Sequence, residues 1–159
     1  MDRKTHGIIT CMDSRLDPIR ISGLSAENTH IIRNAGGRVT NDAIRSMIIA
    51  HKFLGTKDWQ IIHHTDCMVG KLTDEIIQEA LAFNIEPAEF DGDVWQNNKS
   101  SDINDQSNSI SQIEWQTFTD LEQSLIEDIE IIKSHPLIPD DINISGYVFD
   151  LSNDELKPI

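Results

Sequence analysis

Short apolar runs alternate with amphipathic stretches along the first half of the chain. Runs rich in β-branched residues at 8–10, 28–33 and 58–63 are typical of buried strands. Between the last two runs, apolar residues recur every three or four positions over 40–54, which predicts a helix that ends at Gly55. A strand, a helix and another strand joined by short links predict an α/β fold, with a central, mostly parallel sheet flanked by helices.

The second half of the chain continues this pattern with longer gaps. A helix is predicted from Thr73 to about Pro87, and another over 120–133, where Leu and Ile residues recur in helical register. Residues 143–149 alternate as in a final strand. Between the two helices, residues 91–112 are rich in Asn, Ser, Asp and Gln, which is typical of a solvated loop or an insertion.

The length of the chain suits one domain that spans 1–159 and buries a real core. No apolar stretch approaches the roughly 20 residues that cross a bilayer. The first residues lead directly into a strand and do not resemble the apolar core of a signal peptide. We therefore expect a cytoplasmic protein with no membrane-spanning segment.

The charge of the chain excludes some partners. Its 13 basic and 27 acidic side chains give a formal charge of −14, which repels nucleic acid and anionic membrane surfaces. The acidic residues concentrate after position 74, so a pocket that accepts anions can still form near the arginines of the first third. Those arginines are Arg15, Arg20, Arg33, Arg38 and Arg45.

Both cysteines of the chain lie just after a predicted strand. Cys11 follows the run at 8–10, and His64 and Cys67 follow the run at 58–63. Because parallel strands end at the same edge of a sheet, these three side chains are expected to meet there. Two thiolates and an imidazole are donors that zinc prefers, and three protein ligands leave a fourth position open, as in catalytic zinc sites.

Three other arrangements could use these residues. A disulfide between Cys11 and Cys67 leaves His64 without a function. A Cys11 nucleophile with His64 as its base leaves Cys67 without one. A phosphatase loop needs an arginine six positions after its cysteine, where this chain has Asp17. Zinc is the interpretation that uses both cysteines and the histidine.

Asp13 and Arg15 lie two positions apart and next to Cys11, so they point the same way if the segment is extended. A carboxylate beside a metal either coordinates it or accepts a hydrogen bond from what the metal binds. A guanidinium that grips the carboxylate keeps it ionised and can hold it away from the metal. The plainer alternative is a surface ion pair of little consequence.

Six segments of the chain resemble those of the β-class carbonic anhydrases. They are CMDSRLDP at 11–18, RNAGG at 33–37, TNDAIRS at 40–46, LGT at 54–56, HHTDC at 63–67 and ISGYVFD at 144–150. The resemblance covers most of the chain except residues 91–112, and its motifs are specific in combination. The chain is therefore identified as a member of this family.

The resemblance implies a parallel-sheet α/β fold, a Zn²⁺ cofactor and a homodimer or higher homo-oligomer. It implies that Cys11, His64 and Cys67 bind zinc, and that Asp13 and Arg15 form a catalytic dyad that gates the fourth position. The reaction it implies is the reversible hydration of carbon dioxide to bicarbonate, by attack of a zinc-bound hydroxide.

The resemblance leaves some features open. Met68 stands where relatives usually have glycine, and its bulk beside a ligand could narrow the pocket. His63 and His30 are candidates to carry the released proton, although a histidine near an apolar strand is more often structural. Gly36 and Gly37 either bring backbone close to the metal pocket or simply form a turn.

The ligand set does not separate related substrates. Compact relatives include enzymes that hydrolyse carbonyl sulfide or carbon disulfide with the same zinc triad, which is the first alternative function. A zinc-binding scaffold or sensor without turnover is the second. That reading is favoured if Met68 blocks the open position or Asp13 ligates zinc permanently.

Overall fold

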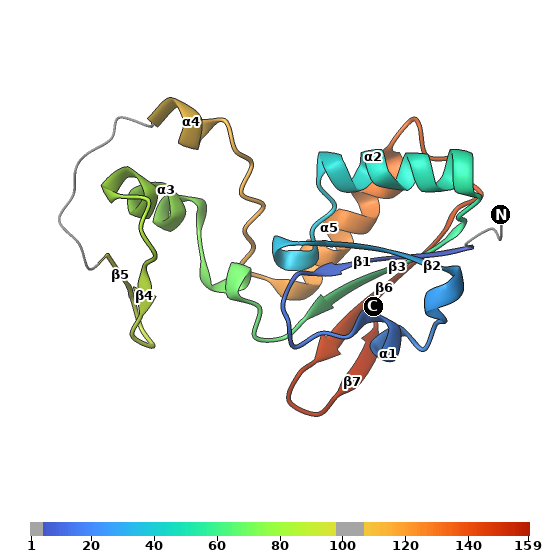
Figure 1. Cartoon of the computed structure of the whole chain (residues 1–159), viewed down its shortest axis with the longest axis horizontal. Helices are drawn as coiled ribbons and strands as arrows, with labels where there is room; N and C mark the ends of the chain where they lie inside the picture. The colour runs from blue at the N-terminus through green and yellow to red at the C-terminus, as the bar shows by residue number, and fades with distance from the viewer. Residues whose placement is uncertain (1–4, 98–106) are drawn as a thin grey trace. The chain divides into compact units, whose positions relative to one another are not determined.

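The computed structural model describes residues 5–97 and 107–159, and its centre is a five-stranded sheet (Figure 1). The strands run in the order β2-β1-β3-β6-β7, and the first four are parallel. This confirms the predicted α/β fold, while the antiparallel edge strand β7 is an addition to it. Their bounds are β1 His6–Cys11, β2 Thr29–Asn34, β3 Asp58–His64, β6 Asn143–Asp150 and β7 Glu155–Pro158.

The described residues group into two compact units. The first contains the five-stranded sheet and consists of residues up to Lys71 together with Phe118–Ile159. The second is Leu72–Thr117. The prediction of a single domain over 1–159 stays a prediction, and each unit is described by itself below.

Capping residues in the sequence set the limits of the main helices in the first unit. Thr40 accepts a hydrogen bond from the Ala43 backbone N–H and so begins α2, and Gly55, at φ 83°, ends the π-helical turn that follows it. The helical segments are α1 Pro18–Ser22, η1 Ala26–Asn28, η2 Ala35–Gly37, α2 Asn41–Ile49, η3 Ala50–Leu54, η4 Met68–Lys71 and α5 Leu121–Ser134.

The sheet of the first unit buries a cluster on each face. Because successive side chains of a strand point to opposite faces, Ile9 packs with Met47 of α2 and Leu125 of α5, whereas Ile8 packs with Leu16 on the other side. Figure 1 shows α2 and α5 over one face and α1 near the other. The second cluster also includes Cys11 and Cys67.

Gly146, in the middle of β6, allows α5 to pack closely on the sheet. A Cβ at this position would lie 2.5 Å from Ile129 Cδ1. The glycine is therefore a point of close approach between a helix and a strand, where any larger residue would require the Ile129 side chain to shift.

The second unit consists of short elements around α3 Asp74–Phe83, which begins at the predicted place with Thr73 as its cap. The helix ends at Phe83, before the predicted limit near Pro87. The strands β4 Glu89–Phe90 and β5 Trp95–Gln96 pair antiparallel. The polar segment predicted as a loop over 91–112 therefore contains β5, and α4 Ser107–Ser111 lies at its end. Positions 98–106 of that prediction lie outside the described residues. No helix in the described parts of the chain is long and apolar enough to cross a membrane.

Candidate metal centre

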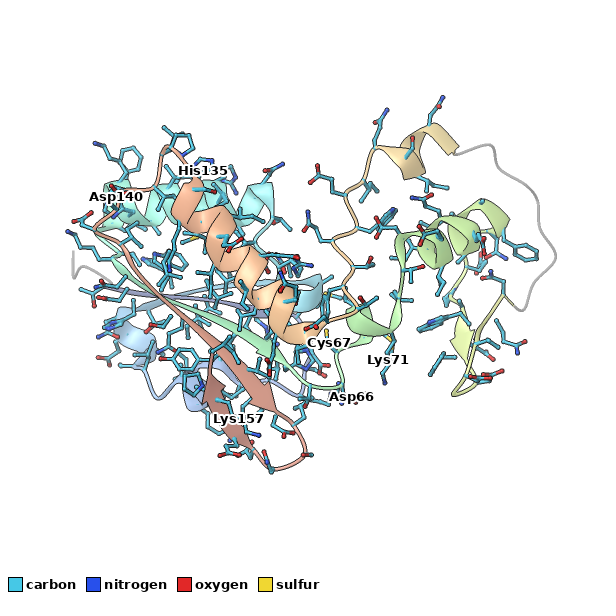
Figure 2. The ribbon with its side chains drawn as sticks, turned by 180° about the vertical axis from the view of Figure 1, so that it is seen from behind. Asp66, Cys67, Lys71, His135, Asp140 and Lys157 are labelled. Carbon is cyan, nitrogen blue, oxygen red and sulfur yellow. The ribbon has the colours of Figure 1, made fainter. Side chains whose placement is uncertain are left out.

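The three predicted zinc ligands lie together where β1 and β3 end. Cys11 is the last residue of β1, His64 is the last residue of β3, and Cys67 follows one short turn later. The two strands pair in parallel, so their ends meet as expected. One donor atom from each of the three side chains lies within 4.8 Å of the others, and all three residues are buried. Figure 2 shows Cys67 just beyond the end of β3.

The distances and hydrogen bonds of this cluster fit a zinc ion. The Cys11 and Cys67 Sγ atoms lie 3.9 Å apart, and two Zn–S bonds of about 2.3 Å at the tetrahedral angle place sulfurs about 3.8 Å apart. His64 Nδ1 donates to the Thr65 carbonyl oxygen at 2.9 Å, which leaves Nε2 as the lone-pair nitrogen. That Nε2 is buried and has no hydrogen-bond partner among the described residues. A buried, unpaired acceptor between two thiols is what a metal would satisfy.

A disulfide between the two cysteines is not formed. Both are free, and 3.9 Å between the sulfurs is nearly twice a disulfide bond length of about 2.05 Å. The hydrogen bond between them lowers the pKa of the Cys11 thiol and raises that of Cys67, which burial raises further. The pair therefore gives up its first proton readily, as metal binding by thiolates requires.

Two unusual backbone conformations bring these side chains together. Gly37 has φ 69°, and a Cβ there would lie 2.7 Å from the Cys11 backbone nitrogen. The close approach to the metal pocket, one of the two possibilities for the Gly36 and Gly37 turn, is thus present at Gly37. Asp66, between His64 and Cys67, has φ 55°, a left-handed conformation that Asp tolerates better than most residues.

Asp13 and Arg15 form a tight pair beside the cluster. The Arg15 side chain donates from Nε to Asp13 Oδ1 at 3.0 Å and from Nη2 to Oδ2 at 2.7 Å, and the Arg15 backbone N–H also reaches Oδ1 at 2.9 Å. These bonds lower the pKa of Asp13 to about 2. Asp13 is not part of the 4.8 Å cluster. The arginine thus holds an ionised carboxylate next to the candidate ligands.

Arg33 is a contact that sequence reasoning missed. Its Nε donates to the Cys11 carbonyl oxygen at 3.0 Å, and its Nη2 donates to the Asp13 carbonyl oxygen at 2.6 Å. Because β2 lies beside β1, an arginine near the end of β2 can hold the backbone that carries both side chains. The sequence places Arg33 just before the turn that follows Asn34, which indicates that it lies near the site. Only the pairing of β1 with β2 shows that it contacts the carbonyl groups of Cys11 and Asp13.

His63 is fully buried and is satisfied within the core. Its Nδ1 lies 3.1 Å from Ser124 Oγ, and its Nε2 lies 3.1 Å from Asp128 Oδ2. Arg38 donates to the same carboxylate from Nε at 2.9 Å and from Nη2 at 3.1 Å. Burial tends to raise the pKa of Asp128, but the hydrogen bonds from His63 and Arg38 outweigh it and the pKa is lowered. This favours the structural interpretation of His63, while His30 as a proton carrier stays a prediction.

A cavity of about 210 Å³ opens beside the cluster. Met68 is not among its lining residues, and 43% of that side chain is exposed. The methionine that stands in place of the usual glycine therefore does not narrow this cavity. The lining residues are His64, Asp66, Cys67, Gly70, Lys71, Phe118, Thr119 and Leu121.

Comparisons with known proteins find related sequences and structures over nearly the whole chain. The sequence model of a family described as carbonic anhydrase matches residues 7–156. The carbon disulfide hydrolase of Saccharolobus solfataricus is 36% identical over 94% of this chain and 74% of that protein. The β-carbonic anhydrase 1 of Mycobacterium tuberculosis is 28% identical over 98% of this chain and 82% of that protein. The crystal structure of the Streptococcus mutans carbonic anhydrase is 37% identical with a TM-score of 0.75, over 99% of this chain and 83% of that one.

Proposed function

Since the chain belongs to the β-class carbonic anhydrase family, whose members are zinc enzymes, we propose that it catalyses the reversible hydration of carbon dioxide to bicarbonate. The observation that supports this most is the buried cluster of Cys11, His64 and Cys67 with an arginine-held carboxylate beside it. Three protein donors leave one position of a tetrahedral metal open, which distinguishes a catalytic site from a closed structural one.

Each residue of the site has a separate function in this proposal. Cys11, His64 and Cys67 hold the zinc, with the His64 tautomer fixed by the Thr65 carbonyl. Bound zinc supplies a nucleophile at neutral pH, because it lowers the pKa of a coordinated water to about 7. Asp13 offers an ionised hydrogen-bond acceptor next to that position. Arg15 orients this acceptor and keeps it from becoming a ligand.

A second candidate function is the hydrolysis of carbon disulfide or carbonyl sulfide. The relatives that favour it include proteins named carbon disulfide hydrolase from Saccharolobus solfataricus and an Acidianus strain, at 36% and 33% identity. A linear molecule with an electrophilic carbon is attacked in every case, so the same residues serve both reactions. The Streptococcus mutans carbonic anhydrase, at 37% identity, supports hydration to a similar degree.

Two assays on the same zinc-loaded preparation test both candidates. Stopped-flow hydration of carbon dioxide measures the first activity, and release of sulfide from carbon disulfide or carbonyl sulfide measures the second. We expect hydration to be the faster of the two and to fall at least about tenfold in Arg15→Gln, which loses the charged hydrogen bonds to Asp13. Asp154→Asn, which alters an exposed arginine pair elsewhere, is the control.

The outcomes separate the functions. Faster sulfide release than hydration would replace the first proposal with the second. A zinc-loaded protein with neither activity would overturn both and leave a zinc-binding scaffold.

We also propose that the chain forms a homodimer or a larger homo-oligomer in the cytoplasm. The family resemblance supports self-association. A β-carbonic anhydrase from Sordaria macrospora that shares the fold at 14% identity is one of two described as tetrameric. The free, buried cysteines support a reducing compartment. Sedimentation velocity of the purified chain tests the first statement, and fractionation of cells tests the second.

A further inference from the structure

Asp66 lies between two candidate metal ligands and contacts the dyad from the opposite side to Asp13. Its carboxylate accepts from Arg15 Nη1 at 2.9 Å, and its backbone carbonyl accepts from Arg15 Nη2 at 3.0 Å. Figure 2 shows Asp66 beside Cys67 and Lys71. None of the functions assigned above to the site uses this residue.

The Arg15 guanidinium is thus gripped on two sides. Its Nε and one proton of Nη2 serve Asp13, while Nη1 and the carbonyl contact of Nη2 serve Asp66. The Arg15 side chain is 47% exposed. An exposed arginine with a single partner still samples several side-chain conformations, which weakens its ion pair. A planar guanidinium that is hydrogen-bonded along both edges is restricted to one orientation.

Asp66 is itself fixed by three constraints. Lys71 Nζ donates to the second carboxylate oxygen of Asp66 at 2.5 Å. The Asp66 backbone has a left-handed conformation, at φ 55°. Asp66 also lies in the short turn between two candidate ligands, His64 and Cys67. The hydrogen bonds from Arg15 and Lys71 lower the pKa of Asp66 to about 2. Its position therefore follows from the same turn that brings His64 and Cys67 together.

We propose that Asp66 is a positioning residue, which holds Arg15 in the orientation that grips Asp13. In this way the turn between the second and third ligands also sets the geometry of the dyad. In this proposal Asp66 acts through Arg15, and it is not part of the cluster of candidate ligands. The proposal rests on the proposed function only where it assigns Asp13 and Arg15 to the reaction.

Asp66→Asn tests this proposal, because asparagine keeps the shape and the tolerance for positive φ but lacks the charge. The chain offers a matched control in Asp154, which also has positive φ, at 61°, and accepts from both Nη atoms of Arg20, at 2.5 and 2.9 Å. Asp154→Asn removes the same kind of charge from the same kind of conformation. It leaves Arg15 untouched.

The first measurement is solvent exchange of the Arg15 Nε–H by ¹⁵N NMR, which reports the grip on Asp13 without any turnover. We expect exchange about 2- to 5-fold faster in Asp66→Asn, the range that an exposed ion pair supports, and no change in Asp154→Asn. The second is steady-state kinetics, where kcat should fall by a similar factor with KM little changed. Zinc content and thermal midpoint should match those of the parent in both variants.

Unchanged Arg15 exchange in a folded, zinc-loaded Asp66→Asn protein would overturn the proposal, whatever the parent's activity. Equal effects of Asp66→Asn and Asp154→Asn would overturn it too, since they would reflect net charge and not position. The proposed function fails separately, when the parent itself has no hydration activity. Faster exchange with unchanged kcat would also refute the positioning of the dyad for the reaction.

Discussion

Gly37 is the residue whose replacement should damage the metal centre most without altering a ligand. Gly37→Ala places a Cβ 2.7 Å from the Cys11 nitrogen at φ 69°, so both strain and collision oppose it. Gly23→Ala is the matched control, because Gly23 has the same φ of 69° and nothing within 4 Å of its Cβ position. We expect the control to cost about 1 kcal/mol of unfolding free energy and Gly37→Ala at least about 3 kcal/mol. Urea unfolding measures both, and equal costs would contradict the close approach.

Cys67 should be required for metal retention. A Cys67→Ser protein replaces a thiolate with a poor zinc ligand, so its zinc content should fall from about one ion per chain to a small fraction of that. Met68→Ala alters the next residue, which is 43% exposed, and should keep its zinc. Elemental analysis of freshly purified protein measures both. Retained zinc in Cys67→Ser would place the metal elsewhere.

At the residue scale, the sequence predicts the candidate metal ligands better than it predicts the residues that hold the site in place by hydrogen bonds. Cys11, His64 and Cys67 stand out because their types are rare and their chemistry is specific. Asp66 and Arg33 belong to residue types that are usually solvated, and their contacts depend on a left-handed turn and on strand pairing. Neither of these can be read from residue type and spacing.

The buried network of Asp128, His63 and Arg38 joins three elements, and its loss should be costly. Asp128 of α5 is fully buried and bonds to His63 of β3 and to Arg38 just after η2. Asp128→Asn removes the nearest counter-charge of the buried Arg38 guanidinium and leaves it the more distant Glu127 carboxylate, at 4.0 Å, so the change should cost about 3 kcal/mol near neutral pH. Urea unfolding measures this cost. Asp154→Asn, at an exposed pair, should change stability little.

The same network should make the unfolding free energy depend on pH in the acidic range. Because the pKa of Asp128 is lowered in the folded protein, its contribution is complete above the ordinary value of 3.8 and is lost as pH falls below that value. Unfolding free energies of the parent and of Asp128→Asn should therefore converge as pH falls below about 4. A gap of constant size down to about pH 2 would show that His63 and Arg38 do not stabilise the ionised form.

At the element scale, caps and periodicity predict most of the regular structure. Thr40 and Gly55 mark the ends of the α2 region, and Asp120 begins α5 by accepting from the Gln123 N–H at 2.9 Å. The π-helical form of η3 was not predicted, because its side-chain pattern is also compatible with an α-helix. β7 was missed because a four-residue edge strand, ELKP, has almost no alternation to detect.

At the scale of the whole molecule, the strand order β2-β1-β3-β6-β7 differs from the chain order, because β3 pairs with β1 and not with β2. The parallel pairs β1 with β2 and β1 with β3 bring the first and third strand ends together, and this juxtaposition gathers the candidate ligands. The specific contacts between α5 and the sheet could not be predicted from the sequence. They join residues as far apart as His63 and Asp128, for which one sequence carries no signal.

The net charge should govern how copies of the chain associate. Each copy carries −14, so two copies repel each other, and at about 0.1 M salt this repulsion is screened beyond roughly 10 Å. If the proposed homodimer is held by apolar and hydrogen-bonded contacts, the dimer fraction in sedimentation velocity should rise between about 20 mM and about 300 mM sodium chloride. The same salt should raise the urea midpoint, since self-repulsion within one copy is screened as well. A dimer that weakens with salt would instead indicate an interface of opposite charges, where the few basic residues of one copy meet the acidic surface of the other.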